Sequence, residues 1–226
     1  MSILCPGCII LVIQGGYIMF RQYGSIIFDL DGTLWEPTET CVVSWNEVLS
    51  TFDEIDQPIT AEAIQSVFGM KVDLIPGVLF PSLSKEQQQK VPSACTAYEQ
   101  QYIKKHGAKL YEELKPILAT LKQTHRLFIV SNCQSGYIES FLDYYGLQSY
   151  FTDFECPGNT GLDKSENIKL IIERNHLSSP IYVGDTMGDF EAANLNHLPF
   201  YFAEYGFGSV KHPDVRLKKL SDLMSE

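Results

Sequence analysis

The stretch "IIFDLDGTLW", Ile26 to Trp35, constrains the fold more than any other part of the sequence. Its first residues form an apolar run typical of a buried strand, and two carboxylates, Asp29 and Asp31, stand where that strand is expected to end. An aspartate before glycine is common in turns, but a turn needs only one of them. The pair therefore indicates chemistry at the end of a buried strand.

The remaining pattern alternates between strands and helices. Short β-branched and aromatic runs predict strands at Ser25 to Leu30, Arg126 to Val130, Ile181 to Val183 and Pro199 to Phe202. Helices are predicted at Ser135 to Tyr145, Lys164 to Asn175, Met187 to Leu195 and near Asp214 to Met224. Strands separated by helices predict an α/β fold, a Rossmann-like doubly wound parallel sheet with helices on both faces.

The segment between Glu36 and about Leu110 carries helix signals and no clear strand. The signals are helix starts at Thr38, Thr60 and Ser84, a capping box completed by Gln87, stops at Gly69 and Gly107, and Pro92 in the first turn of a further helix. We therefore expect an α/β core at 19–35 and 110–226, an inserted helical domain at 36–109, and an apolar extension at 1–18.

The apolar start of the chain predicts neither a membrane span nor a signal peptide. It is short for a span, lacks a positively charged beginning and has no small-residue cleavage site. Its "CPGC" has Cys-x-x-Cys spacing but no second cysteine pair, which weakens a redox or zinc interpretation. The codons for Gln14 to Gly16 could form a ribosome-binding sequence, so a start at Met19 is an alternative.

The net charge limits the classes of partner that we expect, and the cysteines indicate the compartment. The formal net charge is -11 and no basic block offsets it, which disfavours nucleic acid and anionic membranes. The six cysteines have no framework spacing, and this suits a reducing cytoplasm. We expect a cytoplasmic protein, a monomer or weak homodimer, without nucleic-acid or membrane partners.

Further polar residues follow the other predicted strands. Ser131 and Asn132 follow the second strand, Asp185 ends "IYVGD", and Asp189 comes four residues later. In doubly wound sheets ligands bind outside the carboxyl ends of the strands, so these groups are expected to share one crevice with Asp29. Clustered carboxylates need a cation, and oxygen-only ligands favour Mg²⁺.

"DLDGT", "SN", the isolated Lys164 and "GDTMGD" resemble, in this order, the four signature motifs of the haloacid dehalogenase-like superfamily. The helical insertion is similar to the superfamily's type-1 cap, and the chain resembles its phosphoglycolate phosphatase-like members. The resemblance implies an Mg²⁺-dependent phosphatase that cleaves a small phosphorylated metabolite through an aspartyl-phosphate.

Carried over by position, the resemblance implies a role for each motif residue. Asp29 becomes the nucleophile, and Asp31 becomes the general acid and then the general base. The other implied roles are phosphoryl binding by Ser131 and Lys164, substrate binding by Thr33 and Asn132, and metal binding by Asp29, the Asp31 carbonyl, Asp185 and Asp189, the last through water or by orienting Lys164.

Specificity is expected to reside in the cap. Between Arg21 and Arg126 there is no arginine, and Lys71, after the helix stop at Gly69, is the best candidate to contact substrate. A solvated loop lysine is an equally good interpretation. The missing arginine disfavours a phosphomutase of the same superfamily, which must hold a second phosphate in the cap. A non-catalytic Mg²⁺ or phosphate sensor is the other alternative.

Overall fold

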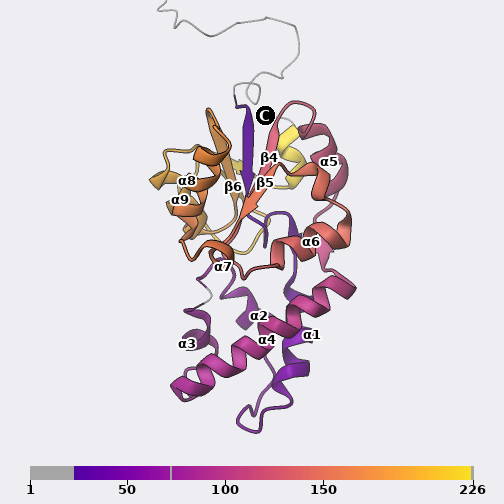
Figure 1. Ribbon diagram of the computed structural model, residues 1–226, viewed down its shortest axis with the longest axis vertical. Coiled ribbons are helices and arrows are strands. Elements are labelled where there is room, and N and C mark those ends of the chain that lie inside the picture. The colour runs from indigo at the N-terminus through magenta and orange to yellow at the C-terminus, as the bar shows by residue number, and fades with distance from the viewer. Residues whose placement is uncertain (1–22, 72, 225–226) are drawn as a thin grey trace, which may run out of the picture.

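The computed structural model describes residues 23–71 and 73–224, and its central feature is a six-stranded sheet (Figure 1). Every neighbouring pair in this sheet is parallel, in the order β5-β4-β1-β6-β7-β8. The strands are β1 Ser25–Phe28, β4 Arg126–Val130, β5 Asp153–Glu155, β6 Pro180–Gly184, β7 Phe200–Ala203 and β8 Val215–Leu217. The predicted α/β class is confirmed.

Helices cover both faces of the sheet because alternate side chains of β1 point to opposite sides. Ile26 and Phe28 belong to the hydrophobic core on one face of the sheet, whereas Ile27 belongs to a second core on the other face. One face carries α5 Leu114–Leu121, α6 Tyr137–Tyr145 and the 3-10 helices η2 Gln148–Tyr150 and η3 Leu220–Met224; the other carries α8 Lys164–Arg174 and α9 Met187–Leu195. A short helix, α7 Pro157–Thr160, precedes α8.

Four helices, here called the inserted helices, lie beyond one end of the sheet (Figure 1). They are α1 Thr38–Leu49, α2 Ala61–Gln65, α3 Ile75–Leu79 and α4 Lys85–His106. Cys41 and Trp45 of α1 pack with Val91 and Cys95 of α4 in a separate hydrophobic cluster. The chain enters and leaves this region through an antiparallel pair, β2 Trp35–Glu36 and β3 Lys109–Leu110.

The predicted helix near Asp214 to Met224 is wrong. The chain forms β8 and then only the short η3. The Asp214 carboxylate accepts a hydrogen bond from the Phe200 backbone N–H at 2.7 Å, which ties the segment to β7. Leu217 is buried and Val215 packs against the same core, so their spacing of two residues suits a strand at the edge of the sheet.

The predicted helix boundary at Pro92 is also wrong, because α4 runs through it without a break. Val91, Cys95, Glu99 and Ile103 are buried at spacings of four residues, and helix α4 packs along α1. That continuous buried stripe stabilises one long helix although Pro92 lacks a backbone N–H. The capping box of Ser84 and Gln87 forms as predicted.

The apolar stretch 1–18, its CPGC motif and the alternative start at Met19 lie outside the described residues. Within 23–71 and 73–224, no helix combines the length and the apolar character that a bilayer crossing requires.

Candidate active site

The loop after β1 brings the two aspartates of the first motif toward the end of β6. The Asp29 backbone N–H donates to the Val183 carbonyl at 2.8 Å, which continues the parallel pairing past the strand. The chain then turns at Gly32, whose φ is +80°. A Cβ at Gly32 would lie 2.2 Å from Asp185 Oδ2, so only glycine permits this approach.

Lys164 lies between two carboxylates at the centre of the site. Its Nζ donates to Asp29 Oδ1 at 2.7 Å and to Asp189 Oδ1 at 2.5 Å, and all three side chains are buried. The Ser131 hydroxyl also hydrogen-bonds Asp29. Burial raises the pKa of Asp29 to about 6, although the Lys164 charge opposes that rise. Burial alone would lower the pKa of Lys164, but the charges of Asp189 and Asp29 hold it above its usual value.

Donors contact both carboxylate oxygens of Asp189, which suits it to orient Lys164. Besides the lysine, Oδ1 faces the Tyr182 hydroxyl at 3.3 Å. Oδ2 accepts from the Thr186 backbone N–H at 2.9 Å and from the Thr186 hydroxyl at 2.6 Å. Neither partner was predicted from the sequence. The Thr-x-x-Asp pattern of a capping box could have revealed Thr186, whereas Tyr182 looked like an ordinary strand residue.

Oxygen atoms of Asp29, Asp185 and Asp189 lie within 4.8 Å of one another, an arrangement that could hold a metal ion. Asp185 Oδ2 accepts from the Phe207 backbone N–H at 2.7 Å, while its buried Oδ1 has no partner within the described residues. Burial and the negative charges of Asp189 and Asp29 raise the pKa of Asp185 well above its usual value. Such an oxygen-only donor set with an unpaired buried atom fits Mg²⁺.

The Asp31 carboxylate stands apart from this cluster of three aspartates, beside two aromatic donors. Its Oδ1 accepts from the Trp35 indole N–H at 2.5 Å and from the Tyr137 hydroxyl at 3.1 Å. Burial, followed by the charge of Asp29, raises the pKa of Asp31 to about 8. Asp31 can therefore carry a proton at neutral pH while Asp29 is mostly ionised. Neither Trp35 nor Tyr137 was anticipated, because no motif spacing pairs an aromatic donor with this aspartate.

The three expected substrate-binding residues occupy different positions. Thr33 is buried behind the motif loop, and its hydroxyl has no partner within 23–71 and 73–224. The Asn132 amide donates to the carbonyl of Gly69 at 2.9 Å, so it contacts the inserted region. Lys71 is not brought to the cluster: its Nζ is 3.9 Å from the exposed Asp163 carboxylate, and its side chain is 55% exposed.

The loop after α2 closes over the site. Phe68 stacks on Phe207 of the loop after β7 with ring centroids 4.5 Å apart. Gly69, with φ +78°, packs so closely that an added Cβ would lie 2.9 Å from the Thr186 methyl group. Together with the contact from Asn132, these interactions place the inserted helices directly against the end of the sheet that carries Asp29.

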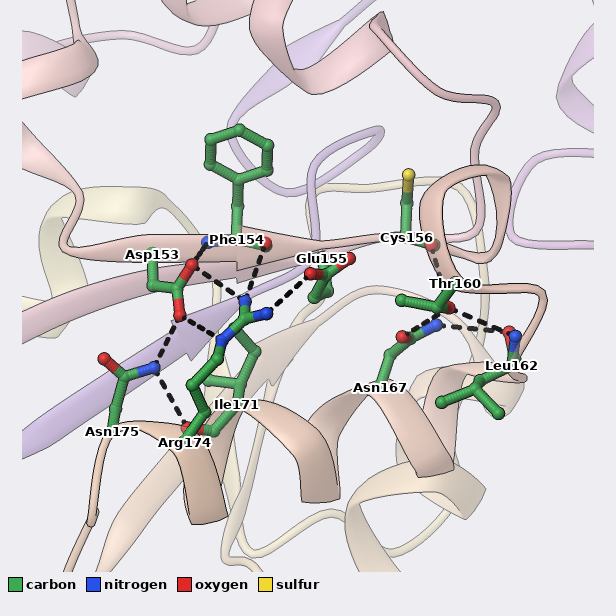
Figure 2. Close-up of polar contacts among 10 residues, drawn as sticks. All are labelled: Asp153, Phe154, Glu155, Cys156, Thr160, Leu162, Asn167, Ile171, Arg174 and Asn175. Atoms are coloured by element: carbon green, nitrogen blue, oxygen red, sulfur yellow. Dashed lines mark hydrogen bonds and ion pairs between the residues drawn. The ribbon is translucent and has the colours of Figure 1, made fainter.

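Helix α8 begins at Lys164, and polar contacts fix both of its ends (Figure 2). At its C-terminal end, Arg174 donates to both Asp153 oxygens at 2.8 and 2.9 Å and to Glu155 at 2.9 Å. At its N-terminal end, the hydroxyl of Thr160 donates to Asn167 Oδ1 at 2.8 Å. These contacts tie the helix to β5 and α7 and so restrict where its first residue can lie.

Replacing Arg174 by Lys is expected to lower the free energy of unfolding by about 1 kcal/mol, since a lysine cannot make the forked contact to Asp153 and the site is partly exposed. Chemical denaturation measures this change. Lys169→Ala on the same helix is the control: that lysine pairs with Glu173 only at 3.9 Å and both side chains are about two thirds exposed. Equal effects of the two substitutions would contradict the anchoring role of Arg174.

Comparison with known proteins identifies the family of the chain. A family model described as haloacid dehalogenase-like hydrolase matches residues 26–202, so the chain belongs to that family. No curated protein matches the sequence significantly.

Solved structures share the fold at low sequence identity. A predicted phosphatase from Clostridium acetobutylicum is 23% identical with a TM-score of 0.73, covering 89% of this chain and 96% of its own. A predicted phosphoglycolate phosphatase from Haemophilus somnus is 19% identical with a TM-score of 0.79, covering 91% and 98%. CbbY from Rhodobacter sphaeroides, in complex with phosphate, is 15% identical with a TM-score of 0.74, covering 89% and 96%.

Proposed function

We propose that this protein is an Mg²⁺-dependent phosphatase that cleaves a small phosphomonoester through an aspartyl-phosphate on Asp29. The observation that carries this proposal is the different environment of two neighbouring carboxylates, of which Asp29 is buried and Asp31 is partly buried. Asp29 is held by Lys164 and Ser131 with a pKa of about 6, and Asp31 lies among aromatic groups with a pKa of about 8. At neutral pH one serves as a nucleophile and the other as an acid.

In the first step an Asp29 carboxylate oxygen attacks phosphorus, and the bond from phosphorus to the ester oxygen breaks. Asp31 gives its proton to that oxygen, which leaves as an alcohol. In the second step water attacks the phosphorus of the aspartyl-phosphate and gives a proton to Asp31. Asp29 leaves as a carboxylate, so inorganic phosphate is released and both residues return to their starting states.

The other residues of the site bind and orient. Lys164 and Ser131 hold phosphoryl oxygens, and Asp189 keeps the Lys164 ammonium in place. Asp29, Asp185 and the Asp31 carbonyl would hold Mg²⁺, with Asp189 acting through water because its oxygens already have donors. The ion would neutralise the negative charge that carboxylates and phosphate bring together.

Phosphate release from p-nitrophenyl phosphate and acetyl phosphate, with and without Mg²⁺, tests this function. A phosphatase releases phosphate from both only with the metal, whereas a sensor of Mg²⁺ or phosphate binds without turnover. The similarity to a predicted phosphatase and to a predicted phosphoglycolate phosphatase supports the choice of substrates with a phosphoryl group.

Chelation is expected to remove activity, Mg²⁺ to restore it, and Ca²⁺ to fail, because Ca²⁺ tolerates more oxygen ligands and would bind Asp29 through both oxygens. Mg²⁺ should also raise the unfolding temperature of the wild type by relieving repulsion among the buried carboxylates. The same titration with Asp185→Asn should give a smaller rise. Full activity in excess chelator would contradict the metal assignment.

A further inference from the structure

A cavity of about 60 Å³ opens beside Asp31 and extends into the inserted helices. Asp31 lies at its core end, and the loop after β4 forms one wall. From the inserted region, the lining residues are Cys41, Trp45, Ile64, Val67, Phe68 and Glu99, among others. Because Asp31 gives its proton to the ester oxygen, the group attached to that oxygen would enter this cavity.

Among the described residues that line this cavity, two have carboxyl groups and none has a basic side chain. They are Asp31 and Glu99, and no lysine, arginine or histidine accompanies them. Glu99 is buried in α4, 6% exposed. Its Oε1 accepts from the Cys41 thiol at 3.2 Å, and its Oε2 accepts from the Trp45 indole N–H at 2.7 Å.

Glu99 retains capacity to bind a ligand. Each carboxylate oxygen can accept about two hydrogen bonds, and here each has one protein donor. Burial raises the pKa of Glu99, although the bonds from Trp45 and Cys41 oppose the rise. Because no cationic side chain of the described residues lines this cavity, a negative charge placed in it would be desolvated without a counter-charge, which is unfavourable.

Two side-chain amides of the loop after β4 also line this cavity. Asn132 Oδ1 and Gln134 Nε2 are buried, belong to residues of the cavity lining, and have no hydrogen-bond partner in the described part of the chain. One is an acceptor and the other a donor. A hydroxyl group can satisfy both kinds, since it donates one hydrogen bond and accepts others, whereas a carboxylate only accepts and an ammonium only donates.

Building on the phosphatase function proposed above, we propose that the substrate is a small phosphomonoester with an uncharged, hydroxyl-bearing leaving group, selected by Glu99 together with Asn132 and Gln134. The cavity accordingly excludes a leaving group with a carboxylate, as in phosphoglycolate, or with a second phosphate, as a phosphomutase requires.

Lys71 does not offset this acidity. It lines a separate hollow with Asp73, Pro157 and Asp163. Cys133 and Gln134 border both spaces, so the two are neighbours, but the lysine itself is absent from the lining beside Asp31. The cation that the sequence suggested for substrate binding thus faces solvent near Asp163.

Three esters of similar size test the proposal on the wild-type protein with Mg²⁺: glycerol 3-phosphate, phosphoglycolate and O-phosphoethanolamine. The value of kcat/KM for glycerol 3-phosphate is expected to exceed that for phosphoglycolate by about 10-fold or more, the scale of one hydrogen bond to a charged group. Preference for phosphoglycolate would overturn the proposal. Preference for O-phosphoethanolamine would also overturn it, in favour of an ammonium ligand.

Glu99→Gln keeps the side chain's size and removes its charge. It is expected to reduce the ratio of kcat/KM between glycerol 3-phosphate and phosphoglycolate by about 10-fold, and a general loss of activity cancels in this ratio. Lys71→Ala is the comparison variant and should leave the ratio unchanged. A larger change from Lys71→Ala than from Glu99→Gln would overturn the proposal. Thermal unfolding of both variants verifies that they fold, and the wild-type panel stands without them.

Failure of this inference is distinguishable from failure of the proposed function. If the wild type hydrolyses acetyl phosphate and prefers phosphoglycolate, it is a phosphatase and only the assignment of the leaving group is overturned. If it hydrolyses neither acetyl phosphate nor any of the three esters with Mg²⁺ present, the phosphatase function is overturned and the inference with it.

Discussion

Asp29→Asn is expected to abolish turnover, with a loss on the order of 10⁴-fold or more, because an amide cannot form the aspartyl-phosphate. Steady-state phosphate release measures the loss, and trapping of phosphoprotein from acetyl phosphate measures the missing intermediate. The variant retains a side chain of the same size between Ser131 and Lys164.

The unfolding temperature of the Asp29→Asn variant is the control, because it shows whether the variant is folded. Folding raises the pKa of Asp29 from 3.8 to about 6. At neutral pH the ionised carboxylate of Asp29 therefore lowers the stability of the folded state, and an uncharged amide avoids that cost. The unfolding temperature of the metal-free variant is therefore expected not to be lower than that of the wild type. Near-normal phosphate release by this variant would contradict the role of Asp29 as nucleophile.

Asp31→Asn is expected to lower kcat for ordinary alkyl phosphates by about 10² to 10⁴-fold, the range of general acid-base catalysis. Its formation of phosphoenzyme from acetyl phosphate should fall much less, because that leaving group needs little protonation. The measurement is the ratio of the two losses. Equal losses on both substrates would argue that Asp31 only shapes the site.

The pH profile gives a second test of the same residue. Burial raises the pKa of Asp31 to about 8, so the protonated acid predominates below that value and is lost above it. Cleavage of alkyl phosphates by the wild type should therefore fall as the pH rises through about 8. Phosphoenzyme formation from acetyl phosphate should lack this decline, and a decline with both would point to another group.

The motif residues could be read from the sequence because local order determines where they lie. Asp29, Ser131 and Asp185 each follow a buried strand, and parallel strands end at the same edge of the sheet. The strand and helix pattern of the core was predictable for the same reason. The two edge strands, β5 and β8, were missed, because each has only three residues and carries little periodic signal.

Contacts between segments far apart in sequence were not predictable. Tyr137 reaches Asp31 across 106 residues of sequence, and Glu99 reaches the cavity beside Asp31 from α4. On the sequence alone Glu99 looks like an exposed helix residue, and its burial depends on how α4 packs along α1.

The sequence by itself determined the α/β class, the clustering of carboxylates at the strand ends and the interruption of the core by helices, since each depends on local pattern or on strand ends. Only the tertiary structure decided which side chains line the cavity beside Asp31: it placed Lys71 near Asp163, joined the Asn132 amide to the Gly69 carbonyl and buried Glu99 in the cavity wall. The physical reason is that helix packing and loop closure fix which side of each inserted element is buried, and a single sequence records that choice only weakly.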